Sequence, residues 1–117
     1  MGNPLQKTPI IQQTLAQLKD SSASVDAIIA DESTDLEVYR AAEEQKGEIE
    51  DRISTLENLQ LVKDTQAMQD LVPQIKQAKS DLDSVLAKIS KASDLVDGVT
   101  KLLGVVDALV VAAKAVA

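Results

Sequence analysis

The fold of this chain is decided by residues 71–117, which read LVPQIKQAKSDLDSVLAKISKASDLVDGVTKLLGVVDALVVAAKAVA. Apolar residues recur along this stretch at alternating steps of three and four, which is the period of one face of an α-helix. The series contains no polar residue and consists of Leu71, Ile75, Ala78, Leu82, Val85, Ile89, Ala92, Val96, Val99, Leu103, Val106, Val110, Ala113 and Ala117. The stretch therefore predicts helical structure with an unbroken aliphatic face.

The composition of the whole chain agrees with a helical fold. At 117 residues it has the length of one domain. Four glycines and three prolines supply few of the turns that an all-β fold requires. The only aromatic residue is Tyr39, so the core must be aliphatic, and binding of nucleic acid by base stacking is not expected.

The N-terminal part of the chain predicts one helix behind a short lead. Residues 1–7 have no periodicity and are expected to fray. Thr8 is a suitable N-cap and Pro9 suits the first helical position, because a proline there loses no helical hydrogen bond. We predict a helix over residues 9–31 and expect it to run through the polar, serine-rich segment 19–24.

A second helix is predicted over residues 35–62. Thr34 followed by Glu37 has the spacing of a capping box, in which the hydroxyl and the carboxylate each accept a hydrogen bond from a main-chain amide. Glu48 and Arg52 are four residues apart and can pair on the exposed side. The expected buried face consists of Leu36, Tyr39, Ala42, Ile49, Ile53, Leu56, Leu59 and Val62.

The second half of the chain predicts two more helices. We place a loop at residues 63–70 and start the third helix after it, because an earlier start would put Pro73 inside the helix at a cost of about 3 kcal/mol. Polar residues around Gly98 indicate that this helix ends there. The predicted third and fourth helices therefore span residues 71–97 and 99–116.

Two architectures are compatible with these helices. In a long antiparallel hairpin of two helical arms, each arm would be about 75 Å long, and the apolar C-terminal face would require a second copy or a ligand to cover it. Bending both arms, near residues 31–34 and at Gly98, gives an up-down four-helix bundle with short connections. We predict this all-α four-helix bundle, which buries that face within one chain. The oligomerising two-helix coiled-coil hairpin is the alternative.

The residue types present exclude several classes of chemistry. The net charge is −7, and residues 20–57 hold most of the acids, so the chain lacks the basic stripe of a nucleic-acid-binding protein. Histidine and cysteine are absent, which removes imidazole and thiol catalysis and ordinary zinc sites. A calcium-loop pattern starts at Asp31, but Leu36 and Ala42 stand where that loop needs glycine and glutamate. We expect no catalytic, cofactor or metal site, no small-molecule substrate and no enzymatic activity.

The apolar series points to a protein partner. We expect a non-enzymatic interaction or assembly module that binds a second copy of itself, or a helix of another protein, through an aliphatic seam. The predicted seam consists of Leu82, Val85, Ile89, Val96, Val99, Leu103, Val106 and Val110. The acids of residues 20–57 are expected to form a solvated face, and the alternative is a docking surface for a basic partner.

Residues 99–117 allow a second interpretation, because they are apolar nearly all round. Lys101, Asp107 and Lys114 oppose a stable membrane span, whereas an in-plane helix tolerates them. The alternative function is therefore a hydrophobe- or membrane-binding helical protein, such as a lipid carrier or a subunit of pore-forming type. Its expected lipid contacts are Leu102, Val105, Leu109, Val111 and Val116. A basic and apolar leader is absent from the start of the sequence, so we expect no secretory signal and a soluble chain.

Overall fold

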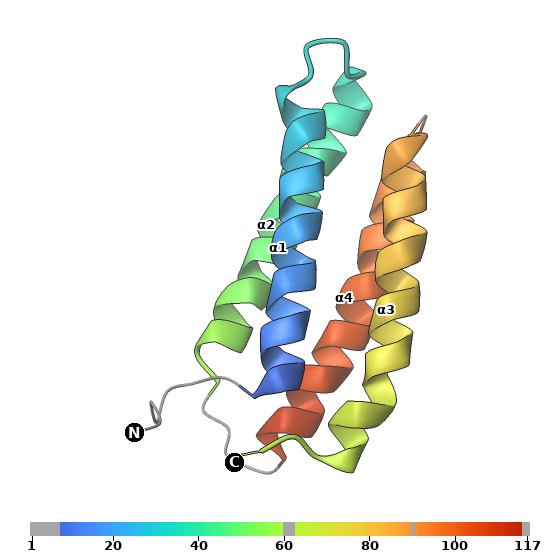
Figure 1. Cartoon of the computed structure of the whole chain (residues 1–117). Helices are drawn as coiled ribbons and strands as arrows, with labels where there is room; N and C mark the ends of the chain where they lie inside the picture. Colours follow the sequence, from blue (N-terminus) through green and yellow to red (C-terminus); the bar gives the residue numbers. More distant parts are fainter. Residues whose placement is uncertain (1–7, 60–62, 90, 116–117) are drawn as a thin grey trace.

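Figure 1 shows the protein as a computed structural model, which describes residues 8–59, 63–89 and 91–115. The four helices are α1 (Pro9–Ala30), α2 (Leu36–Glu57), α3 (Gln66–Ala87) and α4 (Ala92–Lys114), and the described residues contain no strand. The helices run alternately up and down in one elongated bundle with extents of 49 × 25 × 18 Å. The predicted all-α four-helix bundle is confirmed, and the extended hairpin with arms of about 75 Å is wrong.

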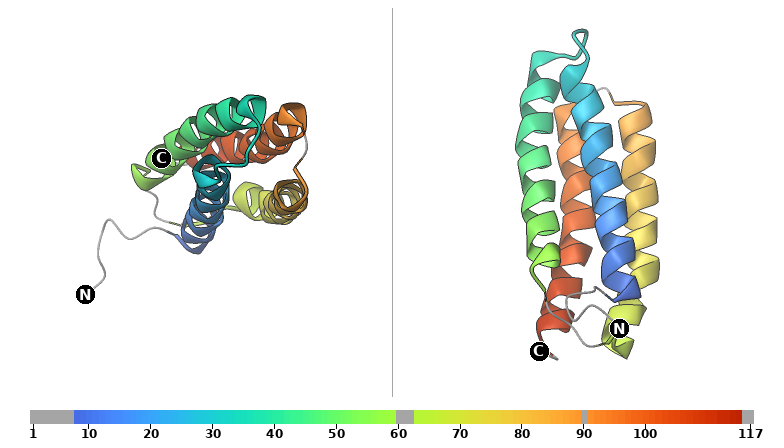
Figure 2. Two further views of the ribbon diagram at one scale, coloured as in Figure 1. Left: turned by 90° about the horizontal axis from the view of Figure 1, so that it is seen from above. Right: turned by 60° about the vertical axis from the view of Figure 1, so that its left-hand side comes forward.

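The bundle consists of two antiparallel hairpins, α1–α2 and α3–α4, packed side by side. Between the hairpins, α1 packs against α3 and α2 packs against α4, and each of these pairs is parallel (Figure 2). The consecutive helices α2 and α3 lie across the diagonal of the bundle and are not neighbours. One consequence is that α1 packs against α3, although the two helices are far apart in the sequence.

The core of the bundle is organised around α4. The side chains of Leu95, Val99, Leu102, Val106, Leu109 and Ala113 on this helix have no exposed surface. They belong to one cluster with fully buried residues of the other helices, among them Leu18, Val25, Ile49, Leu56, Met68 and Leu82. Burial of one large aliphatic side chain contributes about 1.5–3 kcal/mol. This burial explains why the C-terminal segment is apolar nearly all round.

The start of α1 agrees with the sequence prediction. Thr8 is the N-cap, and its Oγ1 accepts a hydrogen bond from the amide of Ile11 at 3.4 Å. The proline that follows occupies the first turn. A distant carboxylate adds to this cap, because Oδ2 of Asp64 accepts a hydrogen bond from the amide of Ile10 at 3.1 Å. The helix continues without a break through residues 19–24, as predicted.

The predicted capping box at the start of α2 is wrong. The N-cap is Asp35, whose carboxylate accepts a hydrogen bond from the amide of Glu37 at 3.2 Å. Thr34 instead donates its hydroxyl hydrogen to the carbonyl of Ile28 at 2.8 Å. The threonine therefore closes the end of α1 and does not begin α2.

The buried face of α2 also differs from the predicted one. Its buried residues are Val38, Ala42, Gln45, Ile49 and Leu56. Leu36 is 59% exposed and Tyr39 is 36% exposed, so the face is rotated near the start of the helix and includes a polar residue. The helix ends at Glu57, before the predicted end at residue 62. Val62 lies outside the described residues.

The third helix begins earlier than predicted, at Gln66, and Pro73 therefore lies inside it on an exposed position. Thr65 caps this early start, because its Oγ1 accepts a hydrogen bond from the amide of Met68 at 3.3 Å. Met68 itself is fully buried. The cap contributes about 1 kcal/mol and the buried methionine about 2 kcal/mol. Together they offset the roughly 3 kcal/mol that an interior proline costs.

The break between the last two helices lies at residues 88–91 and not at Gly98. The third helix ends at Ala87, and α4 begins at Ala92. Gly98 is buried within α4, and a Cβ placed on it would lie 3.1 Å from Cδ1 of Leu82. This glycine therefore allows α3 and α4 to approach closely. The boundary predicted at Gly98 is wrong.

Candidate interaction site

The predicted seam lies inside the bundle. Its buried members are Leu82, Val99, Leu103, Val106 and Val110. Val85, Ile89 and Val96 are partly buried. Because these side chains pack within one chain, the seam offers little surface to a partner in this conformation.

The residues expected to contact lipid differ widely in exposure. Leu102 and Leu109 have no exposed surface, and Val105 is partly buried. Val111 is 68% exposed. Val116 lies outside the described residues. Within residues 8–59, 63–89 and 91–115, no helix combines the length and the apolar character of a membrane span.

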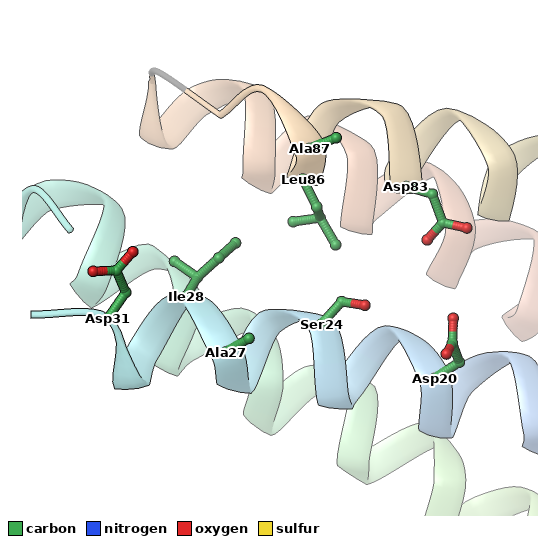
Figure 3. Close-up of a pocket in the computed structure, with 8 residues that line it drawn as sticks. All are labelled: Asp20, Ser24, Ala27, Ile28, Asp31, Asp83, Leu86 and Ala87. Atoms are coloured by element: carbon green, nitrogen blue, oxygen red, sulfur yellow. The ribbon is translucent and has the colours of Figure 1, made fainter. Parts of the chain in front are cut away.

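An open groove runs between α1 and α3 in the half of the bundle near the α1–α2 loop (Figure 3). Its volume is about 500 Å³. It is lined by Asp20, Ser24, Ala27, Ile28, Asp31, Asp83, Leu86 and Ala87. Figure 3 shows Asp20 and Asp83 facing each other at one end, Asp31 at the other end, and Ile28 and Leu86 between them. The groove thus combines an apolar middle with acidic ends.

Small side chains leave this groove unfilled. Ser24 and Ala27 line it from α1, and Ala87 lines it from α3. The larger apolar residues of the lining, Ile28 and Leu86, are only partly buried. An α-helix pair packs closely when side chains of one helix fill the grooves of the other. Here that filling is incomplete, and a further helix has room to supply it.

Lys79 connects α1 and α3 at the end of the groove where Asp20 and Asp83 face each other. Its Nζ lies 2.7 Å from Oδ2 of Asp20 and 2.6 and 2.7 Å from the two carboxylate oxygens of Asp83. Burial lowers the pKa of Lys79, but the hydrogen bonds to Asp20 and Asp83 outweigh burial and leave the pKa above its ordinary value. The lysine is therefore charged and holds α1 to α3.

The groove keeps a negative charge at each end. The single lysine is shared between Asp20 and Asp83, so one negative charge remains there. At the other end, Asp31 accepts hydrogen bonds from the hydroxyl of Ser33 at 2.7 Å and from its amide at 2.9 Å. These two bonds lower the pKa of the Asp31 carboxyl. A cation that enters the groove would be attracted to both ends.

Among the described residues, two further hollows are smaller than this groove. One of about 280 Å³ lies between α2 and α4, where the guanidinium of Arg52 pairs with Asp107 at 3.0 and 3.1 Å. The other, of about 310 Å³, is lined in part by Asp31, Val38 and Ile89. Asp31 lines both this hollow and the groove between α1 and α3, so the two lie next to each other at the Asp31 end of the groove.

The acidic residues do not gather into a metal site. In the part of the chain that the structure describes, no group of three or more carboxylates is placed to hold an ion. The calcium-like pattern begins with Asp31, which accepts hydrogen bonds within its loop. It continues with Asp35, which caps α2. Both carboxylates therefore have structural uses.

None of the residues that line the groove belongs to the predicted seam. One signal in the sequence points in retrospect to the end of the groove at Asp83. Lys79 and Asp83 have the four-residue spacing of an ion pair on one helix face. This signal does not identify the facing helix, because the neighbour of α1 is set by tertiary packing.

Comparison of the chain with protein-family models, with curated proteins and with solved structures finds no match.

Proposed function

We propose that this protein is a non-enzymatic interaction module that holds one helix of a different protein in the groove between α1 and α3. The observation that supports this function is the groove itself, which is open, has an apolar middle and lies between two parallel helices. Proteins commonly bind amphipathic helices by laying their apolar face into such a groove. The bound helix would complete the packing that the small residues on α1 leave unfinished.

The dimensions of the groove suit a helix better than a small molecule. Asp20 and Asp31, which mark its ends, are eleven positions apart in the sequence, or about 16 Å along a helix. A helix of about three turns has this length. Small-molecule sites usually enclose most of their ligand, whereas this groove is open along its length.

A different protein is favoured over a second copy as the occupant. The seam that would join two copies is largely buried within each chain. The chain carries a net charge of −7, and the groove is negative at both ends. A second copy would therefore bring like charge toward the groove, which disfavours association.

Lipid or membrane binding through α4 is the alternative function. The exposure of Val111 favours it. Since Leu102 and Leu109 are buried in the core, lipid would contact them only after α4 had left the bundle. Flotation with neutral and with anionic liposomes tests this alternative, and protein that stays out of both kinds of vesicle would exclude it.

Selection from a displayed library of helical peptides tests the docking proposal. The bait is the full-length protein, and retained peptides are tested again on two variants that place tryptophan on exposed alanines. Ala27→Trp blocks the groove, and Ala108→Trp is a matched control on α4 outside it. Circular dichroism establishes that both variants fold.

We expect peptides that bind the wild type and Ala108→Trp but fail to bind Ala27→Trp. A selection that yields no peptide, or only peptides that bind Ala27→Trp as well as the wild type, contradicts the proposal.

A further inference from the structure

The charges at the two ends of the groove identify the chemistry of the partner, provided that the groove binds a helix as proposed above. We propose that the bound helix is basic and carries two cationic side chains eleven residues apart, with aliphatic side chains between them. One cation pairs with Asp20 and Asp83, and the other pairs with Asp31.

The first end has acceptors that its own lysine does not satisfy. An ammonium group has three donors, and Nζ of Lys79 uses them on one oxygen of Asp20 and both oxygens of Asp83. Two carboxylates together have more lone pairs than these bonds occupy. The side chain of Asp20 is 66% exposed. A cation on a partner therefore finds both a net negative charge and accessible oxygens.

The second end has a similar acceptor. Both hydrogen bonds from Ser33 go to Oδ1 of Asp31, so Oδ2 can accept a bond from a partner. Asp31 lies just beyond the last residue of α1 and is exposed. An arginine suits this position, because its guanidinium is always charged and one of its five N–H donors can bond to Oδ2.

The separation of the two ends sets the spacing on the partner. Eleven residues of an α-helix make about three turns, so side chains at positions i and i+11 project from the same side. Positions i+4 and i+7 project there as well and would meet Ala27, Ile28 and Leu86 in the middle of the groove. Because the pattern is nearly symmetrical, a partner running in either direction can satisfy it.

Neutral and acidic helices are poorer occupants of the same groove. A neutral helix forms the apolar contacts but no ion pairs, and an acidic helix is repelled at both ends. An exposed ion pair changes an affinity by about two-fold to five-fold. Helices with the same apolar face would bind with similar affinity through the apolar contacts alone. The charges at the ends of the groove therefore determine which of these helices binds most tightly.

Four synthetic helical peptides with the same length and the same apolar face test this inference by calorimetry at low salt. They carry arginine at i and i+11, glutamine at these positions, glutamate at these positions, or arginine at i and i+5, where the second arginine points away from the groove. We expect the glutamine peptide to bind about five-fold more weakly than the first peptide and the glutamate peptide more weakly still. The peptide with arginine at i and i+5 keeps one of the two ion pairs, so we expect it to recover about half of the affinity that the glutamine peptide loses, measured as the logarithm of the dissociation constant.

Matched variants of the protein test the assignment of Asp31. Asp31→Asn keeps an oxygen that accepts the hydrogen bonds of Ser33 and removes the charge. Glu32→Gln removes the same charge one residue away, outside the groove lining. We expect Asp31→Asn to weaken binding of the arginine peptide about three-fold and to leave the glutamine peptide unchanged. Glu32→Gln is expected to change the affinity for both peptides by the same factor. This factor should be smaller than the change that Asp31→Asn causes for the arginine peptide.

The results separate the two proposals. If the glutamine or glutamate peptide binds as tightly as the arginine peptide, and Ala27→Trp still abolishes binding, the groove docks helices but the basic partner is wrong. If Ala27→Trp leaves binding of every peptide unchanged, or no peptide binds, the docking proposal itself is wrong. A stable dimer in light scattering whose dissociation is promoted by Ala27→Trp would identify a second copy as the occupant and would overturn both proposals.

Discussion

Arg52 on α2 and Asp107 on α4 form a two-point ion pair, with Nε 3.0 Å from Oδ1 and Nη2 3.1 Å from Oδ2. This pair joins the two hairpins at one parallel interface, and Lys79 with Asp20 joins them at the other. Each hairpin contributes one member to each pair. The two pairs therefore favour the observed arrangement, in which α2 and α3 lie across the diagonal, over an arrangement in which these helices are neighbours. Aliphatic packing alone discriminates poorly between such alternatives.

The pair of Arg52 and Asp107 is expected to contribute measurably to stability. Arg52→Gln should lower the free energy of unfolding by about 1 kcal/mol, because a bidentate pair with good geometry is lost. A double-mutant cycle with Asp107→Asn should give a coupling energy of about 0.5–1 kcal/mol. Urea denaturation measures both quantities. Arg40→Gln, at an exposed position of the same helix, is the control and should change stability little. A coupling energy of zero would mean that the pair does not hold the hairpins together.

The stability that Lys79 contributes is expected to disappear at high pH. Burial opposes the charge of Lys79, but the hydrogen bonds to Asp20 and Asp83 raise its pKa above the ordinary 10.5. A group whose pKa is raised on folding stabilises the protein fully below its unfolded pKa, and this stability is lost as the pH rises through the folded pKa. The difference in unfolding free energy between wild type and Lys79→Met should be constant from about pH 7 to about pH 9. Above about pH 10.5 the unfolding free energy of the wild type should fall relative to that of the variant.

Urea denaturation at a series of pH values measures this difference. Lys76→Met, which changes an exposed lysine on the same helix, should show a much smaller dependence on pH. A difference between wild type and Lys79→Met that stays constant up to about pH 11.5 would be incompatible with the charged, paired lysine.

The three helical glycines are expected to respond differently to alanine. A Cβ at Gly47 or Gly104 would have no neighbour within 4 Å, so alanine should raise the unfolding free energy by about 0.5–1 kcal/mol through helix propensity. At Gly98 the added Cβ would lie 3.1 Å from Cδ1 of Leu82, and Gly98→Ala should gain less than the other two. Thermal denaturation compares them. An equal gain at all three positions would show that α3 and α4 are not close at Gly98.

Two valines of α4 are expected to differ sharply in their tolerance of charge. Val106→Asp should unfold the protein, because it buries an unpaired carboxylate at a position with no exposed surface. Val111→Asp places the same group on an exposed position and should change the unfolding free energy by less than about 0.5 kcal/mol. Circular dichroism and urea denaturation measure both variants. A folded Val106→Asp protein of normal stability would show that this part of α4 is not in the core.

The helical period was sufficient to predict the fold class, because every helix has an aliphatic face that must be buried. The helix boundaries depend on competition between the helix propensity of single residues and the free energy of tertiary packing. Pro73 and Gly98 disfavour helix locally, but the cap at Thr65, the burial of Met68 and the close approach of Leu82 outweigh those costs. The free energy of burial and of close helix approach cannot be evaluated before the packing partners are known.

The groove could not be predicted for a related reason. Its residues are unremarkable on each helix taken alone, and they form a channel only because α1 lies next to α3. That neighbour relationship results from the diagonal placement of α2 and α3, which the period of apolar residues does not encode. The ion pairs that accompany it, such as Lys79 with Asp20, join residues far apart in the sequence.

The most direct test of helix docking is a titration of ¹⁵N-labelled protein with the peptide that carries arginine at i and i+11, followed by amide chemical shifts. We expect saturable shifts centred on Ser24, Ala27, Leu86 and Ala87, and their loss in Ala27→Trp. Saturable shifts centred instead on α4 around Val111, or no saturable shifts at all, would contradict a helix-binding groove between α1 and α3.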